Sequence, residues 1–387
     1  MSRPTIAGVA RAAGVSVASV SRVLNGLPAT EEMAERVQRA VAELGYVPDA
    51  RARSLKVGRT FQLTLAVADV GNPVYVTMMR AVEEVVSAAG YRLVVTTTGP
   101  DVVDEVALVR GMARGYADGL LISPIRVDED LVKSIRECEV PVVVAGSVPA
   151  KAGVDTVRAN SPKGMLLAVD HLVARGRNRI AFVNGPADTV PGAARAKGFA
   201  EALKAHNLQP VAVVEADDFT FAAGRAAAPA LLAAGGPDSS RSRRLGATGP
   251  APTSQARGGA GQSAVPAPST SDPQGRAGSR SSASDPQGRA MGGGFDAVIC
   301  ANDLLAVGVM HELAAVGLEV PRDVAVVGMD DSELAEQSFP PLTSVNLGSA
   351  ERGRRAAELL LARIEDNDRT PRRIVVQPSL SIRRSTP

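Results

Sequence analysis

Tryptophan is absent from the chain, and tyrosine and phenylalanine together make up only eleven of its 387 residues. A site lined by many aromatic rings is therefore excluded. Cysteine occurs twice, as Cys138 and Cys300, and neither stands at a metal-ligand spacing from another Cys or His. We expect reduced, packed thiols without a disulfide or a metal site.

Long apolar segments are also missing. No run of about 20 apolar residues could span a bilayer, and no signal peptide stands before the first predicted helix. We therefore expect a cytoplasmic protein without membrane contact. The length of 387 residues exceeds one typical domain, and 45% hydrophobic with 22% charged residues is ordinary for a globular chain.

Motifs of catalysis are lacking as well. The chain has no nucleophile elbow, no P-loop and no metal-spaced cluster, and its three histidines fall in predicted helices without a paired nucleophile. We expect no enzymatic activity and no cofactor.

The N-terminal residues carry a helix-turn-helix pattern. Ile6, Val9, Ala10 and Ala13 recur at helical spacing before a glycine breaks the chain, and a second helix follows. Two short helices joined in this way are typical of a DNA-reading motif. Ser16 is placed to cap the second helix. Val20, Val23 and Leu24 share its buried face. The residues on its outer side are Val17, Ala18, Ser21 and Arg22.

Charge separates this segment from the rest. Residues 1–59 hold nine Lys or Arg against five acids, whereas the remainder of the chain has a small acidic excess. A basic end on an acidic body favours phosphate binding over the alternative of a plain helical bundle. We therefore predict a DNA-binding headpiece over residues 1–48 and a basic hinge over 49–60.

From residue 61 to 387, short apolar runs alternate with helical patterns, such as 79–89, 165–174 and 193–206. This alternation predicts an α/β core with parallel sheets and helices on both faces. We expect two doubly wound subdomains of about four strands each, the second beginning near Ser161, with a late crossover between them. The predicted strands are 63–67, 93–97, 120–123, 140–145, 180–183, 211–214, 297–300 and 324–327.

Polar residues follow these strands, among them Ser123, Asn302 and Asp330. Many such residues only form turns and cap helices. Ligands of open parallel sheets nevertheless bind outside the carboxyl ends of strands, so the group jointly predicts a binding cleft.

Several motifs in combination resemble the lactose/galactose repressor (LacI/GalR) family. They are VSVASVSRVLN at 15–25, GYVP at 45–48, ARSL at 52–55, GRNRIAFVNGP at 176–186, AND at 301–303, VVGMDD at 326–331 and PPLT at 340–343. The resemblance implies a headpiece, a hinge and a core like the type I periplasmic sugar-binding proteins, and it spans nearly the whole chain except one insert.

For DNA binding, the resemblance implies a palindromic operator centred on a C-G step, with Arg22 on a guanine and Leu55 wedged into the minor groove from each of two hinges. Gly8 departs from the family, which usually has an acidic residue there, so we expect a slightly softer headpiece. The predicted DNA contacts are Thr5, Ser16, Val17, Ala18, Ser21, Arg22, Asn25, Tyr46 and Leu55.

For the effector, the resemblance places Arg195, Asn302 and Asp330 at ligand-contacting positions, with Phe219 at an aromatic stacking position. Arg195 could instead be a structural salt-bridge partner. Asn160-Ser161 and Leu347-Gly348 depart from the usual acidic and amide residues of the family, which leaves the effector unnamed beyond a small polar metabolite such as a sugar. The predicted effector contacts are Tyr75, Ser123, Arg195, Phe219, Asn302 and Asp330.

Residues 236–294 are rich in Gly, Ser, Pro and Arg, contain no aromatic residue and carry a duplicated nonapeptide at 269–277 and 282–290. Such a composition cannot bury enough surface to offset ordering, so we predict a disordered insert within the core. We favour a neutral expansion over weak extra contact with DNA or an acidic partner.

Together these features predict a ligand-responsive transcriptional regulator, most simply a repressor that binds palindromic operator DNA as a homodimer. The alternative is a small-molecule (sugar) binding protein without a DNA role. The effector could act as an inducer or as a corepressor, and without a C-terminal heptad repeat we do not expect a tail-mediated tetramer.

Overall fold

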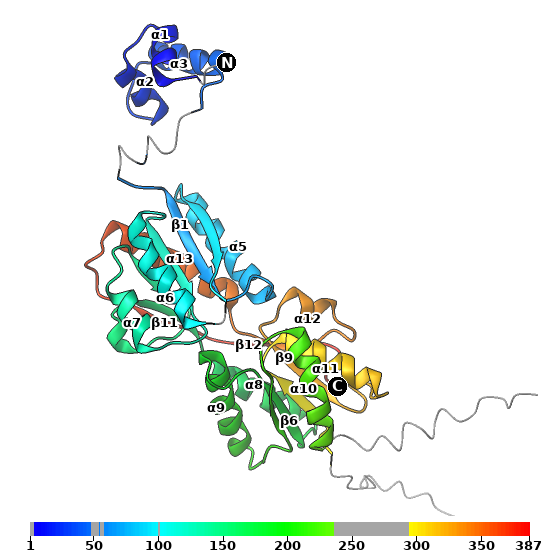
Figure 1. Ribbon diagram of the computed structural model, residues 1–387. Coiled ribbons are helices and arrows are strands. Elements are labelled where there is room, and N and C mark those ends of the chain that lie inside the picture. The colour runs from blue at the N-terminus through cyan, green and yellow to red at the C-terminus, as the bar shows by residue number, and fades with distance from the viewer. Residues whose placement is uncertain (1–3, 48–53, 55–57, 100, 236–293) are drawn as a thin grey trace, which may run out of the picture. The chain divides into compact units, whose positions relative to one another are not determined.

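The computed structural model describes residues 4–47, 54, 58–99, 101–235 and 294–387 (Figure 1). The predicted wedge residue Leu55, most of the hinge over 49–60, and the insert over 236–294 apart from its last residue lie outside this part of the chain. The described residues divide into two compact units. Unit 1 is Met1–Gly164, Ala187–Ala194 and Asn346–Ser379, and unit 2 is Met165–Pro186, Arg195–Val345 and Leu380–Pro387.

Three helices form the headpiece at the start of unit 1. The axis bends by 102° between the first two, at Gly14, whose φ of 65° lies in the left-handed region that glycine adopts without steric cost. Each helix begins at a hydroxyl that accepts a backbone N–H, as in N-capping. The helices are α1 (Ile6–Ala13), α2 (Val17–Leu24) and α3 (Glu31–Leu44).

The headpiece has its own small core. Val9, Val20 and Val37, one from each helix, are fully buried together with three alanines, and the side chains predicted to share a face in α1 and α2 all belong to this cluster. The helical periodicity therefore predicted the packing correctly. Within the described residues, no single helix is long and apolar enough to cross a membrane.

The remainder of unit 1 is built on a six-stranded sheet in the order β11-β5-β4-β3-β1-β2, with every neighbouring pair parallel. The central strands are buried on both faces, as parallel strands between helical layers are. The strands are β1 (Gln62–Val67), β2 (Arg92–Thr97), β3 (Gly119–Ser123), β4 (Val142–Val144), β5 (Asp155–Ala159) and β11 (Arg373–Val376).

Alternate residues of these strands feed two separate cores. Leu63, Leu65 and Leu121 pack on one side against α5 and α13, whereas Leu120 and Ile122 pack on the other side against α6 and α7. This is the period of two that a strand imposes on its side chains. The elements on the two sides are α5 (Pro73–Ala88), α6 (Val102–Gly111), η1 (Met112–Arg114), α7 (Glu129–Arg136), η2 (Ala150–Ala152) and α13 (Ser349–Glu365).

The chain enters β1 through a carboxylate clamp. Asp118 accepts hydrogen bonds from the Thr60 backbone and hydroxyl at 2.7 and 2.8 Å and from the Phe61 backbone at 2.9 Å. Phe61 has a φ of 57°, a left-handed conformation that is costly for a phenylalanine. The clamp offsets this strain where the hinge side of the chain joins the sheet.

Unit 2 holds the second sheet, in the order β12-β10-β9-β8-β6-β7. The pairs of β6 with β7 and β8, of β8 with β9 and of β9 with β10 are parallel. The strands are β6 (Ile180–Asn184), β7 (Val213–Glu215), β8 (Ala297–Cys300), β9 (Ala325–Met329), β10 (Thr343–Asn346) and β12 (Ser379–Ser381).

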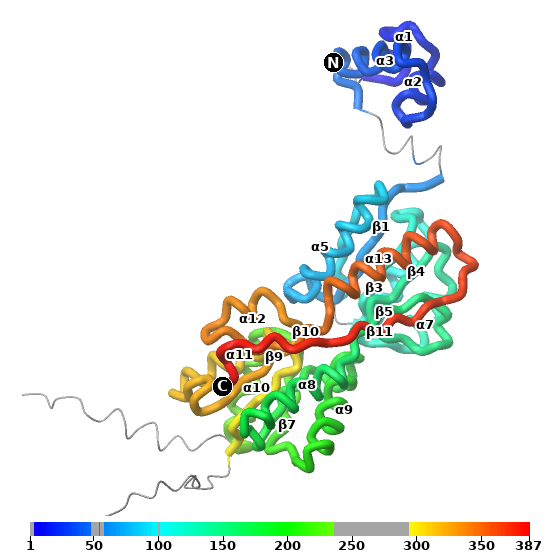
Figure 2. Tube along the Cα trace, turned by 180° about the vertical axis from the view of Figure 1, so that it is seen from behind, coloured from blue at the N-terminus to red at the C-terminus, as the bar shows by residue number. Residues whose placement is uncertain are grey.

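Helices cover this sheet, and the C-terminal segment is fastened to it. Helices α10 and α11 pack on each other and against the sheet. Ser385 and Thr386 are buried, and the Thr386 hydroxyl is 2.8 Å from Nε2 of His171. The tube in Figure 2 follows the chain from α13 through β11 and β12 to this terminus. The helices that lie wholly or partly in unit 2 are α8 (Ser161–Ala174), α9 (Val190–Ala205), α10 (Phe221–Ala233), α11 (Asp303–Ala315) and α12 (Glu333–Gln337).

The predicted α/β class with parallel sheets is correct, but the expected number of strands was wrong. Among the described residues each sheet has six strands rather than about four, because β5, β10, β11 and β12 complete the two sheets. These four are short, and β11 and β12 are only partly buried strands at sheet edges. Polar residues interrupt β5, β10 and β12, so these strands lack the continuous apolar runs by which buried parallel strands are found.

Candidate functional site

The start of α2 presents the outward face that the sequence predicts for base reading. Val17 is 45% exposed, and Ala18 and Arg22 are also exposed, whereas Val20 on the opposite side is fully buried. Ser21 is half-buried between these faces. An exposed valine in the first turn and an exposed arginine in the last turn of α2 can offer a methyl contact and two N–H donors to base edges.

Other predicted DNA contacts already have structural roles in the headpiece. The hydroxyls of Thr5 and Ser16 accept the backbone N–H groups of Gly8 and Ser19 at 3.2 and 3.1 Å. The Asn25 amide donates to the Ser21 carbonyl at 2.6 Å. Tyr46 packs partly against the headpiece core. These side chains order the motif, and their contact with DNA stays a prediction.

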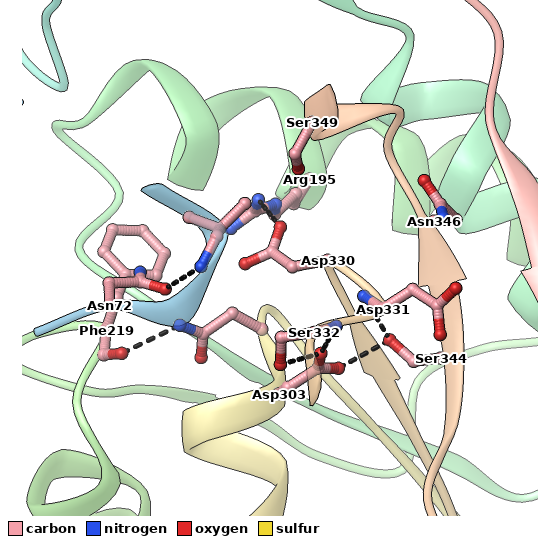
Figure 3. Close-up of polar contacts among 12 residues, drawn as sticks. Asn72, Arg195, Phe219, Asp303, Asp330, Asp331, Ser332, Ser344, Asn346 and Ser349 are labelled. Carbon is pink, nitrogen blue, oxygen red and sulfur yellow. Dashed lines mark hydrogen bonds and ion pairs between the residues drawn. The ribbon is translucent and has the colours of Figure 1, made fainter. Parts of the chain in front are cut away.

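A second group of polar side chains gathers at the carboxyl ends of the strands of unit 2 (Figure 3). Asn302 follows β8 by two residues and Asp330 directly follows β9, and these residues are 1% and 8% exposed. Arg195 comes from α9 and Phe219 from the turn before α10. The structure thus brings together four of the six predicted effector contacts.

Arg195 and Asp330 form a buried ion pair. Their side chains are 8% and 6% exposed, and Nη2 of Arg195 lies 3.3 Å from a carboxylate oxygen of Asp330. The guanidinium also lies over the Phe219 ring, 5.6 Å from its centroid, at a distance typical of a cation–π contact. Arg195 is therefore the salt-bridge partner that the sequence left open as an alternative, and its contact with a ligand stays a prediction.

The Phe219 ring is seated by its surroundings. A side chain on Gly185 would place a Cβ only 2.2 Å from Cε1 of Phe219, so the ring occupies the space that the missing side chain leaves. The Asn302 amide donates to the Phe219 carbonyl at 2.8 Å, while its oxygen accepts the Leu305 N–H at 2.9 Å and caps α11. Asn302 thus holds both Phe219 and the start of α11 in place.

The turn after β9 is strained and tightly bonded. Asp330 and Asp331 have φ values of 109° and 52°, which non-glycine residues seldom adopt. The neighbouring Asp303 is 2% exposed and accepts hydrogen bonds from Ser332. Burial, and next the nearby Asp330 carboxylate, raise the pKa of Asp303 to about 7.

The other two predicted effector contacts belong to unit 1. Tyr75 is half-buried in α5 and lines a hollow of about 20 Å³ with apolar neighbours such as Leu65 and Val67. Ser123 ends β3, is 7% exposed, and donates its hydroxyl hydrogen to the Ala145 carbonyl at 3.0 Å. That bond ties Ser123 to the backbone at the end of β4.

Sequence reasoning missed two residues that shape the unit 2 group, Asp303 and Gly185. Asp303 was visible in the sequence as half of an Asn-Asp pair after a strand, but its burial was not. Gly185 stands in an Asn-Gly-Pro turn that resembles many others. Among the described residues, no group of three or more His, Cys, Asp or Glu side chains could hold a metal ion.

Comparison with known families agrees with this division into headpiece and sensor. Residues 5–49 match the model of bacterial regulatory proteins, lacI family. Residues 60–248 match periplasmic binding proteins and the sugar binding domain of the LacI family, and residues 251–386 match a periplasmic binding protein-like domain. The HTH-type transcriptional regulator CelR of Thermobifida fusca is 32% identical, covering 99% of this chain and 98% of that protein.

The chain belongs to the LacI family. Other relatives over similar lengths are the HTH-type transcriptional repressor PurR of Aliivibrio fischeri, 30% identical, and the ribose operon repressor of Haemophilus influenzae, 29% identical; each alignment covers 98% of both chains. The chain is therefore a ligand-responsive, DNA-binding transcriptional regulator and not an enzyme, as its sequence predicts.

Solved structures agree with the fold. A CelR–cellobiose complex aligns with a TM-score of 0.64 at 31% identity and covers 99% of this chain and all of that one. The lac repressor dimer bound to operator and an anti-inducer aligns with a TM-score of 0.75 at 23% identity, over 100% of this chain and 99% of that one. The latter likeness is one of fold alone.

Proposed function

We propose that this LacI-family regulator represses transcription by binding a palindromic operator as a homodimer, and that a small polar metabolite such as a sugar binds beside Arg195 and Asp330 to change that affinity. The observation that carries the proposal is the presence, in one chain, of an exposed reading face on α2 and a buried guanidinium–carboxylate pair at the strand ends of unit 2. A sugar-binding protein without a DNA role would not need the exposed face of α2.

For the DNA, the proposal assigns Arg22 to a guanine and Leu55 to the minor groove, because each headpiece reads one half-site and two are needed for a palindrome. Arg22 is exposed on α2, as are Val17 and Ala18. A bidentate arginine–guanine contact discriminates between bases by about 1–3 kcal/mol.

The test is fluorescence anisotropy of the full chain on a palindrome centred on a C-G step and on a scrambled duplex. Arg22→Ala should weaken palindrome binding at least tenfold and erase most of the preference over the scrambled site. Arg39→Ala, which removes the same charge from an exposed position on α3, should weaken both duplexes by a similar, smaller factor. If Arg22→Ala binds the palindrome as tightly as the parent does, the assignment fails.

For the effector, the grouped side chains supply complementary chemistry. The Asp330 carboxylate accepts from hydroxyls, the Arg195 guanidinium donates to oxygens, and the Phe219 ring offers an apolar face. The Nε of Arg195 is buried and has no hydrogen-bond partner within the described residues. A ligand oxygen there would satisfy a donor whose unmet desolvation costs about 1–3 kcal/mol.

The effector test adds sugars to the preformed operator complex. Cellobiose and ribose are the first probes, because one related regulator was solved in complex with cellobiose and another relative is a ribose operon repressor. Phosphorylated sugars follow. Release of DNA identifies an inducer, and tighter binding identifies a corepressor. Operator DNA must then change the affinity for the sugar by the same factor.

The assembly and location follow from the same proposal. A dimer is the smallest symmetric assembly that reads a palindrome, and sedimentation at micromolar concentration should give about twice the mass of one chain. Because operator DNA lies in the cytoplasm, we place the protein there as well. A monomer that still binds the palindrome with the affinity of the parent would contradict the dimeric reading.

A further inference from the structure

The carboxylate of Asp303 is the centre of a buried hydrogen-bond network at the end of β9 (Figure 3). One of its oxygens accepts from the backbone N–H and from the hydroxyl of Ser332, both at 2.8 Å. The other accepts from the hydroxyl of Ser344 at 2.5 Å. All three residues are at most 5% exposed, so water does not compete for these bonds.

The network continues into the strained turn. Ser344 Oγ, whose hydrogen points to Asp303, accepts the backbone N–H of Asp331 at 3.0 Å. The turn is thus held at two successive amides, Asp331 through Ser344 and Ser332 through Asp303 directly. Asp330 and Asp331 are the residues with positive φ values of 109° and 52°. Such backbone conformations persist only where the surroundings over-determine them.

The Asp303 carboxylate occupies space that is open because the neighbouring strand residue, Gly328, has no side chain. A side chain on Gly328, within β9, would bring a Cβ to 2.4 Å from the Asp303 oxygen that meets Ser344. The carboxylate therefore lies directly against the backbone of the strand that leads into the turn. Packing against Gly328 and the hydrogen bonds from Ser332 and Ser344 therefore hold the carboxylate in the same position.

We propose that Asp303 is a positioning residue for effector binding: by bonding Ser332 and Ser344 it holds the strained turn that directs the Asp330 carboxylate toward Arg195 and the ligand. This inference rests on the proposed effector site and adds to it the buried side chain that supports the site. Ligand-binding constellations need such support because their geometry must be kept within about half an ångström.

The first test measures amide hydrogen exchange, resolved to single residues, in the ligand-free full chain, so it needs no known effector. Asp303→Leu keeps a side chain of similar volume but removes the acceptor, and should speed exchange at Asp331 and Ser332 at least tenfold. Asp303→Asn keeps one acceptor for Ser332 and can donate to Ser344 Oγ, and should restore most of the protection. A role in packing alone would leave the Leu variant protected.

A milder variant tests the two branches separately. Ser344→Ala should speed exchange at Asp331 while Ser332, which bonds Asp303 directly, stays protected. Ser338→Ala is the matched control, because its hydroxyl donates to the Ala335 and Pro340 carbonyls and not to this network. Unchanged exchange at Asp331 in Ser344→Ala would overturn the proposal even if Asp303→Leu fails to fold.

The second test separates the inference from the proposed function. In the operator assay, Asp303→Leu and Ser344→Ala should raise the sugar concentration for half-response at least tenfold while operator affinity without sugar stays within twofold. If the parent responds to a sugar and both variants respond equally, the positioning role is wrong and the effector site stands. If the parent responds to a sugar and Arg195→Met and Asp330→Asn respond equally to it, the effector site itself is wrong.

Discussion

The guanidinium of Arg195 donates to the carboxylate of Asp330 at 3.3 Å from inside unit 2, where both side chains are more than nine-tenths buried. Two charges withdrawn from water in this way depend on each other, because either one left alone keeps its desolvation cost without the compensating attraction. The pair is therefore both a structural element and the polar centre of the proposed effector site.

Replacement of Arg195 should destabilise the fold as well as the site. Arg195→Met keeps much of the side-chain volume but removes the guanidinium that pairs with the buried Asp330 carboxylate, and we expect the free energy of unfolding to fall by about 3 kcal/mol or more. The matched control is Arg355→Met in α13, whose half-exposed pair with Glu351 should contribute less than about 1 kcal/mol. Chemical denaturation measures both, and equal losses would contradict the dependence on burial.

Gly185→Ala should impair the response to sugar without affecting the fold broadly. The added Cβ would lie 2.2 Å from Cε1 of Phe219, so the ring must leave its position beneath the Arg195 guanidinium. We expect the sugar concentration for half of the change in operator binding to rise about tenfold, equivalent to about 1.4 kcal/mol.

Two comparisons check this reading of Gly185. Gly111→Ala, where an added Cβ would contact nothing within 4 Å, should respond like the parent. The double variant Gly185→Ala/Phe219→Leu should lose less than the sum of its single variants, because both act through the same ring. Additive losses would mean that Gly185 acts through some other neighbour.

Glu105 should make stability fall as the pH rises. The residue is 2% exposed in α6, and burial, reinforced by Asp128, raises its pKa from 4.5 to about 8. The folded state therefore holds a proton that the unfolded chain releases above pH 4.5. The resulting stabilisation is complete below that pH and is lost as the pH rises toward 8.

The neutral isostere Glu105→Gln lacks this titration. Relative to the parent, its free energy of unfolding should increase by about 2–4 kcal/mol between pH 5 and pH 9. Urea denaturation across this range measures the difference. Glu84→Gln, at an exposed position of α5, controls for the loss of one carboxyl group and should differ from the parent by less than about 0.5 kcal/mol throughout.

A cavity in the headpiece should abolish operator binding while sparing the sensor. Val37 is fully buried and packs with Val9 and Val20, so Val37→Ala should destabilise the headpiece by about 1–3 kcal/mol. We expect faster amide exchange confined to α1, α2 and α3, weaker operator binding and unchanged sugar binding. Val47→Ala, at a side chain that is 73% exposed, makes the same substitution without a cavity and should behave like the parent.

The local pattern of the sequence was enough for the headpiece. Helical periodicity, Gly14 and the capping hydroxyl of Ser16 predicted two helices and the side chains that they bury, because contacts within and between adjacent short helices are close in sequence. The strands of the two sheets were found where apolar runs are continuous and missed where short strands mix polar with apolar residues, as in β5 and β10.

The sequence by itself determined the α/β class and the polar residues at the strand ends, since both depend on patterns over a few neighbouring residues. Only the tertiary structure decided which of them meet. The hydrogen bonds of Asp303 join it to Ser332 and Ser344, which lie in other segments of the chain. Gly185 contacts Phe219, which is more than thirty residues away in sequence. Arg195 pairs with Asp330, which lies beyond the insert. Burial and strain arise from such long-range packing, and no local pattern encodes them.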